Sequence, residues 1–196
     1  MTVPDDGLAY PGFADPVHDA QASFRAVLRA LARPGALCTV ATPPAPPPPL
    51  APASAAVLLT LVDADAPVHL PPPFAGLGPW VAFHTGSTGA DIGDAAFVLA
   101  DEWPDLALLA AGTDEVPEAS TTLILQVPAL EGGPRLILRG PGIEATQTFA
   151  PLGLPADFAA RWAANRRLYP RGIDVLLCAG SAVAGLPRSV TVLEAA

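Results

Sequence analysis

The clearest pattern of apolar positions lies near the start of the chain, over residues 16–33. Apolar side chains recur there at steps of three and four residues, at Val17, Ala20, Phe24, Val27, Leu28 and Leu31. This spacing predicts an amphipathic α-helix whose single apolar stripe faces a core. Asp15 suits the N-cap, Pro16 suits the first helical position, and Pro34-Gly35 ends the helix.

Shorter apolar runs follow this helix, and most of them predict strands. Further helices are expected over residues 54–61, 104–111 and 157–168. Strands are expected over residues 36–41, 68–70, 80–84, 97–100, 121–127, 135–139, 143–149, 173–178 and 189–193. Because helices lie between strongly apolar strands, we expect an α/β fold with a mixed sheet flanked by helices. The close succession of strands at 121–127, 135–139 and 143–149 predicts an antiparallel meander.

A proline-rich run over residues 43–52 interrupts this series of elements. Its sequence, PPAPPPPLAP, favours an extended polyproline II conformation. Strong elements lie close on both sides, so we interpret the run as a connector inside one domain that spans residues 1–196. The alternative is a segment that docks on an aromatic groove of a partner protein.

The charged residues exclude several classes of function. All 10 basic residues are Arg, the chain has no Lys, and 19 acidic residues bring the net charge to −9. An acidic domain repels polyanions, so we expect neither nucleic acid nor an anionic membrane as a partner. The absence of Lys excludes mechanisms that need a Lys amine, such as a Schiff base or a P-loop.

The N-terminal residues and the cysteines favour a cytoplasmic protein. The first ten residues have neither the basic nor the apolar region of a secretory signal. The longest apolar run, around residues 55–62, is too short to cross a bilayer. Cys38 and Cys178 each lie in an apolar segment, which favours buried free thiols over a disulfide or a metal pair.

The usual catalytic and metal-binding motifs are missing from the sequence. It contains no GxGxxG, GxxxxGK[ST], HExxH, CxxC or GxSxG pattern. His18, His69 and His84 are far apart and lack the spacing of metal ligands. We therefore expect no metal, no cofactor and no catalytic residue within this chain.

The best candidate for a small-molecule site is the Gly-rich loop HTGSTG at 84–89, which follows a predicted strand. Glycines let backbone N–H groups converge on an anion, and Arg side chains can clamp a phosphate. We predict that His84, Gly86, Ser87 and Arg139 bind an anion. The alternative is a flexible loop without a ligand.

Two arginines near the end of the chain are candidates for contacts with a partner protein. Arg171 precedes the apolar strand at 173–178, and we expect it to pair with Asp174 or with an acidic partner. Arg188 lies in a Leu-Pro-Arg turn before the last strand. Because the sequence shows no self-sufficient active site, we expect a non-catalytic subunit and not an enzyme.

An ordered set of short segments adds a family resemblance. The segments are GFADPVHDAQ at 12–21, ARPG at 32–35, LLTLVD at 58–63, FHTG at 83–86, TTLILQ at 121–126, LRGPGI at 138–143, GID at 172–174 and LPR at 186–188. In this order and spacing they resemble PhnH, the family of H subunits of the bacterial carbon–phosphorus lyase system. The resemblance runs from about residue 12 to residue 192.

The resemblance implies a homodimer with a fold similar to that of pyridoxal-phosphate-dependent transferases, without the cofactor. It implies assembly with G, I and J subunits into a core complex that joins the ribose triphosphate of ATP to methylphosphonate. The product is α-D-ribose 1-methylphosphonate 5-triphosphate, and the family supplies no catalytic residue to carry over. Since this chain has no Lys, it cannot form the aldimine of a pyridoxal enzyme, so the likeness concerns architecture alone.

Two functions of different classes therefore remain open. The first is an accessory subunit of the phosphonate-processing complex. The second is a stand-alone phosphate- or nucleotide-binding enzyme that uses the loop at 84–89.

Overall fold

A computed structural model describes residues 9–195 and shows an α/β fold built around a six-stranded mixed sheet. The strand order is β1-β8-β7-β4-β3-β2, and β2, β3, β4 and β7 are parallel to one another. β8 and β1 extend the sheet in antiparallel fashion. The strands of this sheet are β1 (Cys38–Thr39), β2 (Val68–His69), β3 (Phe97–Ala100), β4 (Thr122–Gln126), β7 (Asp174–Ala179) and β8 (Ala182–Leu186).

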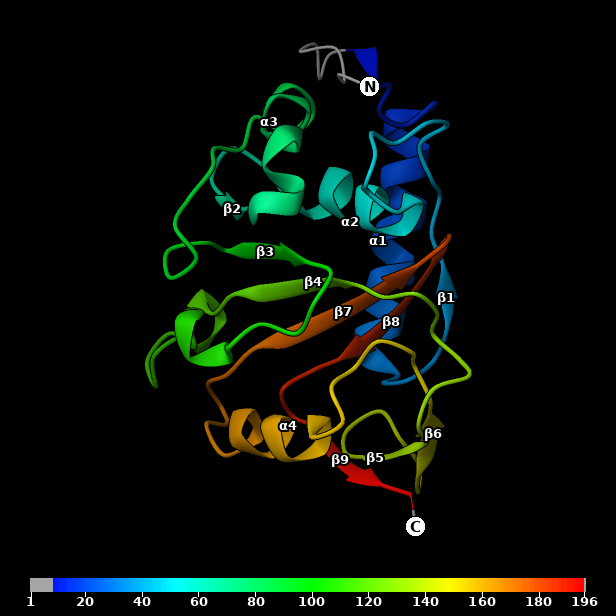
Figure 1. The fold of residues 1–196 in the computed structure, drawn as a ribbon, viewed down its shortest axis with the longest axis vertical. Helices are drawn as coiled ribbons and strands as arrows, with labels where there is room; N and C mark the ends of the chain where they lie inside the picture. Colours follow the sequence, from blue (N-terminus) through cyan, green and yellow to red (C-terminus); the bar gives the residue numbers. More distant parts are fainter. Residues whose placement is uncertain (1–8, 196) are drawn as a thin grey trace.

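Helices and a second sheet cover the two faces of this central layer (Figure 1). One face carries α1 (Pro16–Ala32), α2 (Pro52–Leu61) and α3 (Gly78–Thr85). The other face carries α4 (Phe158–Arg166) and a three-stranded antiparallel sheet of order β6-β5-β9. The strands of this small sheet are β5 (Leu136–Arg139), β6 (Gln147–Phe149) and β9 (Thr191–Glu194).

The alternation of side chains along the central strands creates two hydrophobic cores. In β4, Ile124 packs with α1, α2 and α3, whereas Leu123 and Leu125 pack on the side of α4. In β7, Leu176 and Leu177 divide in the same way. Because both faces are buried, these strands are apolar at nearly every position, and this explains why their sequences are continuous apolar runs.

The structure confirms the mixed α/β class and corrects several predicted elements. Residues 80–84 were expected to form a strand, but they belong to α3, which has Pro79 in its first turn. An apolar run of five residues does not distinguish a strand from a buried helix. Within 104–111, only a 3₁₀ turn forms, at Leu106–Leu108. Two further 3₁₀ turns lie at Pro72–Leu77 and Pro117–Ala119.

The predicted meander is wrong in one strand. β5 and β6 pair in antiparallel fashion, as expected, but the third strand of their sheet is β9. β4 instead lies between β3 and β7 in the central sheet. β8 was not expected from the sequence, because its Ala and Gly residues have weak strand propensity.

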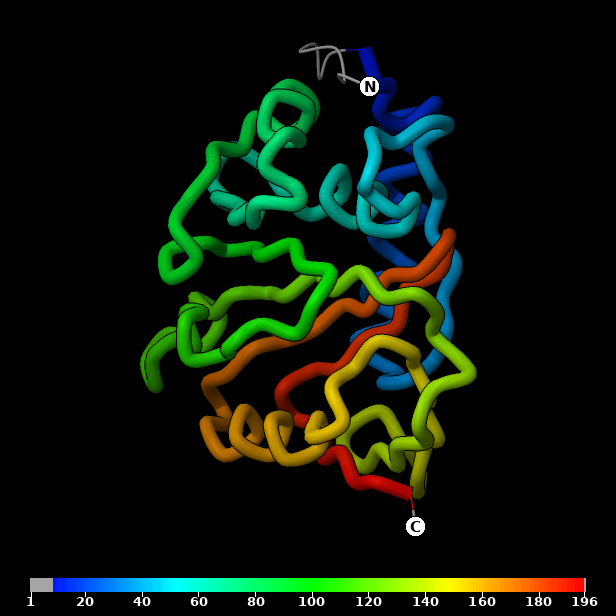
Figure 2. The backbone as a smooth tube through the Cα atoms, viewed as in Figure 1, coloured from blue at the N-terminus to red at the C-terminus, as the bar shows by residue number. Residues whose placement is uncertain are grey.

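The proline-rich run at 43–52 lies against the body of the molecule (Figure 2, cyan). Pro43, Pro47 and Leu50 are buried. The side chain of Gln126, at the end of β4, accepts a hydrogen bond from the backbone N–H of Ala51 and donates one to the carbonyl of Pro49. These two hydrogen bonds attach the end of the run to the central sheet.

Candidate functional site

The predicted anion-binding loop lies at the C-terminal end of α3. His84 and Thr85 are the last residues of that helix, and Gly86 caps it in the left-handed region with φ +74°. His84 Nε2 is 3.2 Å from the carbonyl oxygen of Tyr10, so the ring is held by the segment before α1. A helix C-terminus carries partial negative charge, which disfavours an anion at this place.

The remaining residues of this prediction have other surroundings. Ser87 is buried, its hydroxyl donates to the carbonyl of Ala66 at 2.8 Å, and its N–H donates to Thr85 Oγ1. Arg139 is exposed on β5, at the opposite end of the molecule from α3 (Figure 1). The structure therefore does not bring the four predicted residues to one place.

Arg188 has its charge met inside the protein. Its Nη2 lies 2.7 Å from Asp174 Oδ2, and its backbone N–H donates to Asp174 Oδ1 at 2.7 Å. Nη1 donates to the carbonyl of Pro117 at 2.6 Å. The side chains of Arg188 and Asp174 are 15% and 22% exposed. Most of the guanidinium is thus engaged within the chain, and the predicted partner contact of Arg188 stays a prediction.

Arg171 does not take the partner expected from the sequence. Its Nε lies 3.0 Å from Asp114 Oδ1, in a pair that is largely exposed. Asp174 belongs to Arg188 instead. Proximity in the sequence favoured Asp174 as the partner of Arg171. That Asp174 pairs with Arg188 and Arg171 with Asp114 becomes visible only in the tertiary fold. Arg171 and Asp114 together form a solvated ion pair on the surface.

The segments that carry the family resemblance meet one another in space. The GID segment meets LPR through Asp174 and Arg188. ARPG meets LRGPGI, because a Cβ on Gly142 would collide with the carbonyl oxygen of Ala32. FHTG meets the GF at 12–13, where a Cβ on Gly12 would lie 2.9 Å from the His84 ring. These segments therefore fix tertiary contacts between distant parts of the chain.

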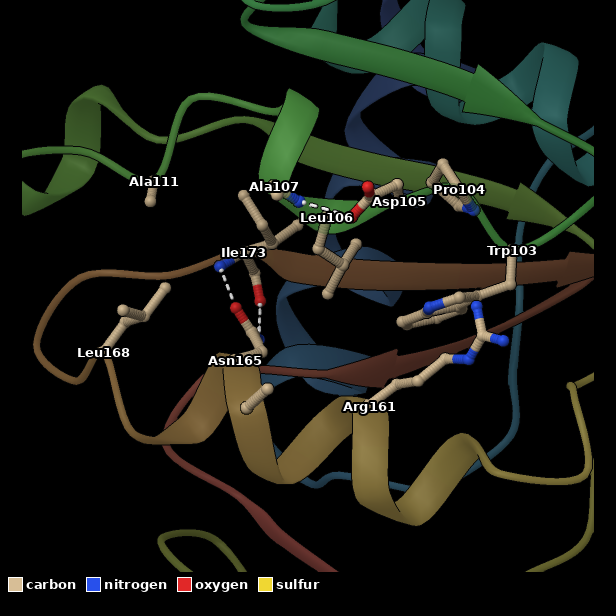
Figure 3. A pocket seen from close by; sticks show the side chains of 11 residues that line it. Trp103, Pro104, Asp105, Leu106, Ala107, Ala111, Arg161, Asn165, Leu168 and Ile173 are labelled. Carbon is tan, nitrogen blue, oxygen red and sulfur yellow. Dashed lines mark hydrogen bonds between the residues drawn. The ribbon is translucent and has the colours of Figure 1, made fainter.

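A cavity of about 600 Å³ lies between α4 and the segment around residues 103–107 (Figure 3). Its walls are mainly apolar, from Trp103, Pro104 and Leu106 on one side and Ala164 and Leu168 on the other. Such a volume is in the range of small-molecule sites. The cavity was not expected from the sequence, because its walls come from segments that no motif connects.

The polar groups of this cavity mostly hold its walls in place. Asn165 donates to the carbonyl of Ile173 at 2.9 Å and accepts from its N–H at 2.8 Å. Arg161 donates through Nε to Asp157 at 2.7 Å, and its guanidinium points toward Trp103 in Figure 3. That hydrogen bond holds the pKa of Asp157 below its usual value. The arrangement suits an apolar group.

The largest departure from sequence expectations is on α1. The helix buries Ser23, Val27 and Ala30, whereas Val17, Phe24 and Leu28 are 74%, 46% and 50% exposed. The predicted apolar stripe is therefore only partly buried, because Val27 lies in the core and Leu31 packs against it, whereas the other three side chains face outward. The stripe of exposed apolar side chains is a surface typical of protein–protein contacts.

Other predicted features can be located directly. Asp15 caps α1 by accepting a hydrogen bond from the backbone N–H of His18. This hydrogen bond, and the His18 ring nitrogen Nδ1 at 2.7 Å from Asp15 Oδ2, lower the pKa of Asp15. Cys38 and Cys178 are free and buried, as predicted. Across residues 9–195, no group of three or more His, Cys, Asp or Glu residues is arranged to hold a metal ion. In the same range, no helix has the length and apolar character needed to traverse a membrane.

Comparison with known proteins yields one family and two relatives. Residues 11–193 match the family described as bacterial phosphonate metabolism protein (PhnH). The chain is 48% identical over 183 residues to the alpha-D-ribose 1-methylphosphonate 5-triphosphate synthase subunit PhnH of Rhizobium meliloti, covering 90% of this chain and 92% of the relative. It is 32% identical over 173 residues to the putative C-P lyase subunit protein HtxG of Stutzerimonas stutzeri, covering 86% and 83%.

Proposed function

The chain belongs to the family of bacterial phosphonate metabolism proteins called PhnH, and from this premise we propose that it is an accessory subunit of the carbon–phosphorus lyase core complex. In this role it is needed for forming α-D-ribose 1-methylphosphonate 5-triphosphate from ATP and methylphosphonate. The observation that carries the proposal is the 48% identity, over nearly the whole chain, to a subunit of the synthase that bears this name.

The interior contacts support an accessory role over catalysis by this chain alone. The Ser87 hydroxyl, the His84 ring and the Arg188 guanidinium are all committed to contacts that hold the fold together. The position of the 84–89 loop at a helix C-terminus gives no support to the alternative of a stand-alone phosphate- or nucleotide-binding enzyme.

The partners we propose are a second copy of this chain and the G, I and J subunits of the complex. The exposed side chains of Val17, Phe24 and Leu28 on α1 support a protein interface there, and we assign this stripe to the homodimer. A cytoplasmic location is proposed on the two buried free thiols.

We further propose that the single domain has the architecture of pyridoxal-phosphate-dependent transferases without their cofactor. The mixed sheet with helices on both faces supports this relationship. The sequence contains no Lys, so the chain has no lysine amine to form an aldimine with such a cofactor.

Affinity purification tests the proposed function. A tagged chain purified from cells that are using methylphosphonate as their phosphorus source should recover the G, I and J subunits. Deletion of its gene should abolish growth on methylphosphonate but leave growth on phosphate intact. Recovery of the chain alone, together with normal growth of the deletion strain, would contradict the proposal.

A further inference from the structure

A basic groove runs between α1 and the outer edge of β1. Its volume is about 410 Å³, and it is lined by Ala22, Arg25, Ala26, Arg29, Leu37, Cys38 and Thr39. Among residues 9–195, no carboxylate lines it. Figure 1 shows β1 at the margin of the central sheet, beside α1. In a chain of net charge −9, a surface with two arginines and no acid is a local reversal of charge.

The two arginines of the groove have no acidic partner in the described part of the chain. Arg25 and Arg29 lie one helical turn apart, so both guanidinium groups reach the same side of α1. None of the ion pairs formed by residues 9–195 involves either side chain. Planar guanidinium groups bind carboxylates through paired hydrogen bonds, so this pair favours an acidic ligand.

The floor of the groove is an unpaired sheet edge. In the part of the chain that the structure describes, β1 is the terminal strand and pairs with β8 alone. The N–H of Val40 donates to Ser181 on the β8 side. Since successive N–H groups of a strand point in opposite directions, the N–H and carbonyl of Thr39 point outward, away from β8. An outward edge of this kind can pair with a further strand.

Apolar side chains complete the surface. Leu37, just before β1, is 45% exposed and lines the groove. Cys38 forms the floor at 6% exposure, and burial raises the pKa of its thiol, so it adds no negative charge. The groove thus offers backbone pairing, one apolar contact and two positive charges.

We propose that this groove binds an extended acidic segment of a partner protein, which adds to the edge of β1 as a new strand with its carboxylates on Arg25 and Arg29. A second copy of this chain fits less well, because a two-fold axis at β1 would bring the arginine pair of one copy close to the arginine pair of the other, and like charges repel. Nucleic acid fits less well, because the net charge of −9 repels it. The partner's membership of the phosphonate complex rests on the proposed function; the chemistry of the groove does not.

A peptide experiment tests the groove without any complex. The probe is a fluorescent octapeptide of alternating Glu and Val, and its Lys–Val counterpart is the control. We expect the acidic peptide alone to bind the full chain, and binding to weaken at least tenfold in the double variant Arg25→Gln/Arg29→Gln. The double variant Arg135→Gln/Arg167→Gln removes the same charge from exposed positions outside the groove and should bind like the wild type.

A second variant separates strand addition from charge. Thr39→Pro removes only the outward N–H, because this N–H does not bond β8, and proline is accepted at the edge of a sheet. The variant should melt within a few degrees of the wild type yet bind the acidic peptide at least fivefold more weakly. Equal binding by all variants, or no binding of the acidic peptide at millimolar concentration, would overturn the inference.

Hydrogen exchange in the assembled complex gives the corresponding result in the physiological setting. The amides of Leu37 and Thr39 should exchange quickly in the isolated chain and at least tenfold more slowly in the complex. A complex that forms while these amides remain unprotected contradicts a partner of the groove within the complex and leaves the proposed function standing. Failure of the wild type to enter a complex contradicts the proposed function, and the peptide result then decides the groove separately.

Discussion

Arg188 and Asp174 form a clamp between two distant turns of the chain. Asp174 opens β7, Arg188 follows β8, and the carboxylate accepts from the backbone N–H, Nε and Nη2 of Arg188. The same guanidinium reaches the carbonyl of Pro117 before β4. One ion pair therefore ties together the N-terminal ends of two central strands and the turn that leads into β9.

Asp174→Ala is expected to lower the free energy of unfolding by about 2–3 kcal/mol, because it leaves a mostly buried guanidinium without its carboxylate. Urea unfolding followed by circular dichroism measures the loss. The matched control is Asp114→Ala, which breaks the exposed pair with Arg171 and should cost less than about 1 kcal/mol. Similar losses in both variants would show that the clamp contributes no more than a surface pair.

Gly142→Ala is expected to destabilise the contact between the ARPG and LRGPGI segments by about 2–5 kcal/mol, the sum of backbone strain and overpacking. Gly142 has φ +81°, and a Cβ there collides with the carbonyl of Ala32. Gly180→Ala is the control, since Gly180 has φ +53° and a Cβ there would meet nothing within 4 Å. It should show the strain alone, about 1–2 kcal/mol. An equal decrease in melting temperature in both variants would contradict a contribution from the contact of Gly142 with Ala32.

The two buried thiols predict how stability changes at alkaline pH. Burial raises the pKa of Cys178 to about 12, above its ordinary value of 9.0. A raised pKa in the folded state stabilises the protein below pH 9, and this contribution is lost as the pH rises toward about 12. We therefore expect the free energy of unfolding to fall above pH 9, with a smaller slope in Cys178→Ala. A slope unchanged by the substitution would contradict this assignment.

The apolar stripe of α1 predicts the oligomeric state. The wild type should have twice the chain mass of 19.9 kDa by light scattering. Phe24→Ser/Leu28→Ser should yield folded monomers, because both side chains are about half exposed within one chain. Leu108→Ser changes an equally exposed leucine elsewhere and should leave the dimer intact. A double variant that remains dimeric would place the dimer interface on another surface.

The sequence predicted the elements whose apolar pattern is long or whose caps are explicit. α1 begins after Asp15 as expected, and β3 spans the predicted residues. Short runs were ambiguous: Trp80–His84 is as apolar as a strand but forms a helix, and β8 lacks the β-branched residues that mark most strands.

The site was harder to predict than the fold, because its contacts join residues far apart in sequence. Local reasoning paired Arg171 with Asp174, three positions away, but the fold gives Asp174 to Arg188. The apolar positions of α1 were visible in the sequence, but which of them are exposed depends on the side of the helix that faces the sheet. Family resemblance identified the family because it drew on the order of many segments, several of which have a structural contact or a core position.

Reconstitution of ribose 1-methylphosphonate 5-triphosphate synthesis tests the central claim most directly. The G, I and J subunits are incubated with ATP and methylphosphonate, with and without this chain, and the chain is also assayed alone. An accessory subunit predicts product from the complete mixture and background levels both when the chain is omitted and when it is alone. Full product formation without the chain, or product formed by the chain alone, would contradict the account.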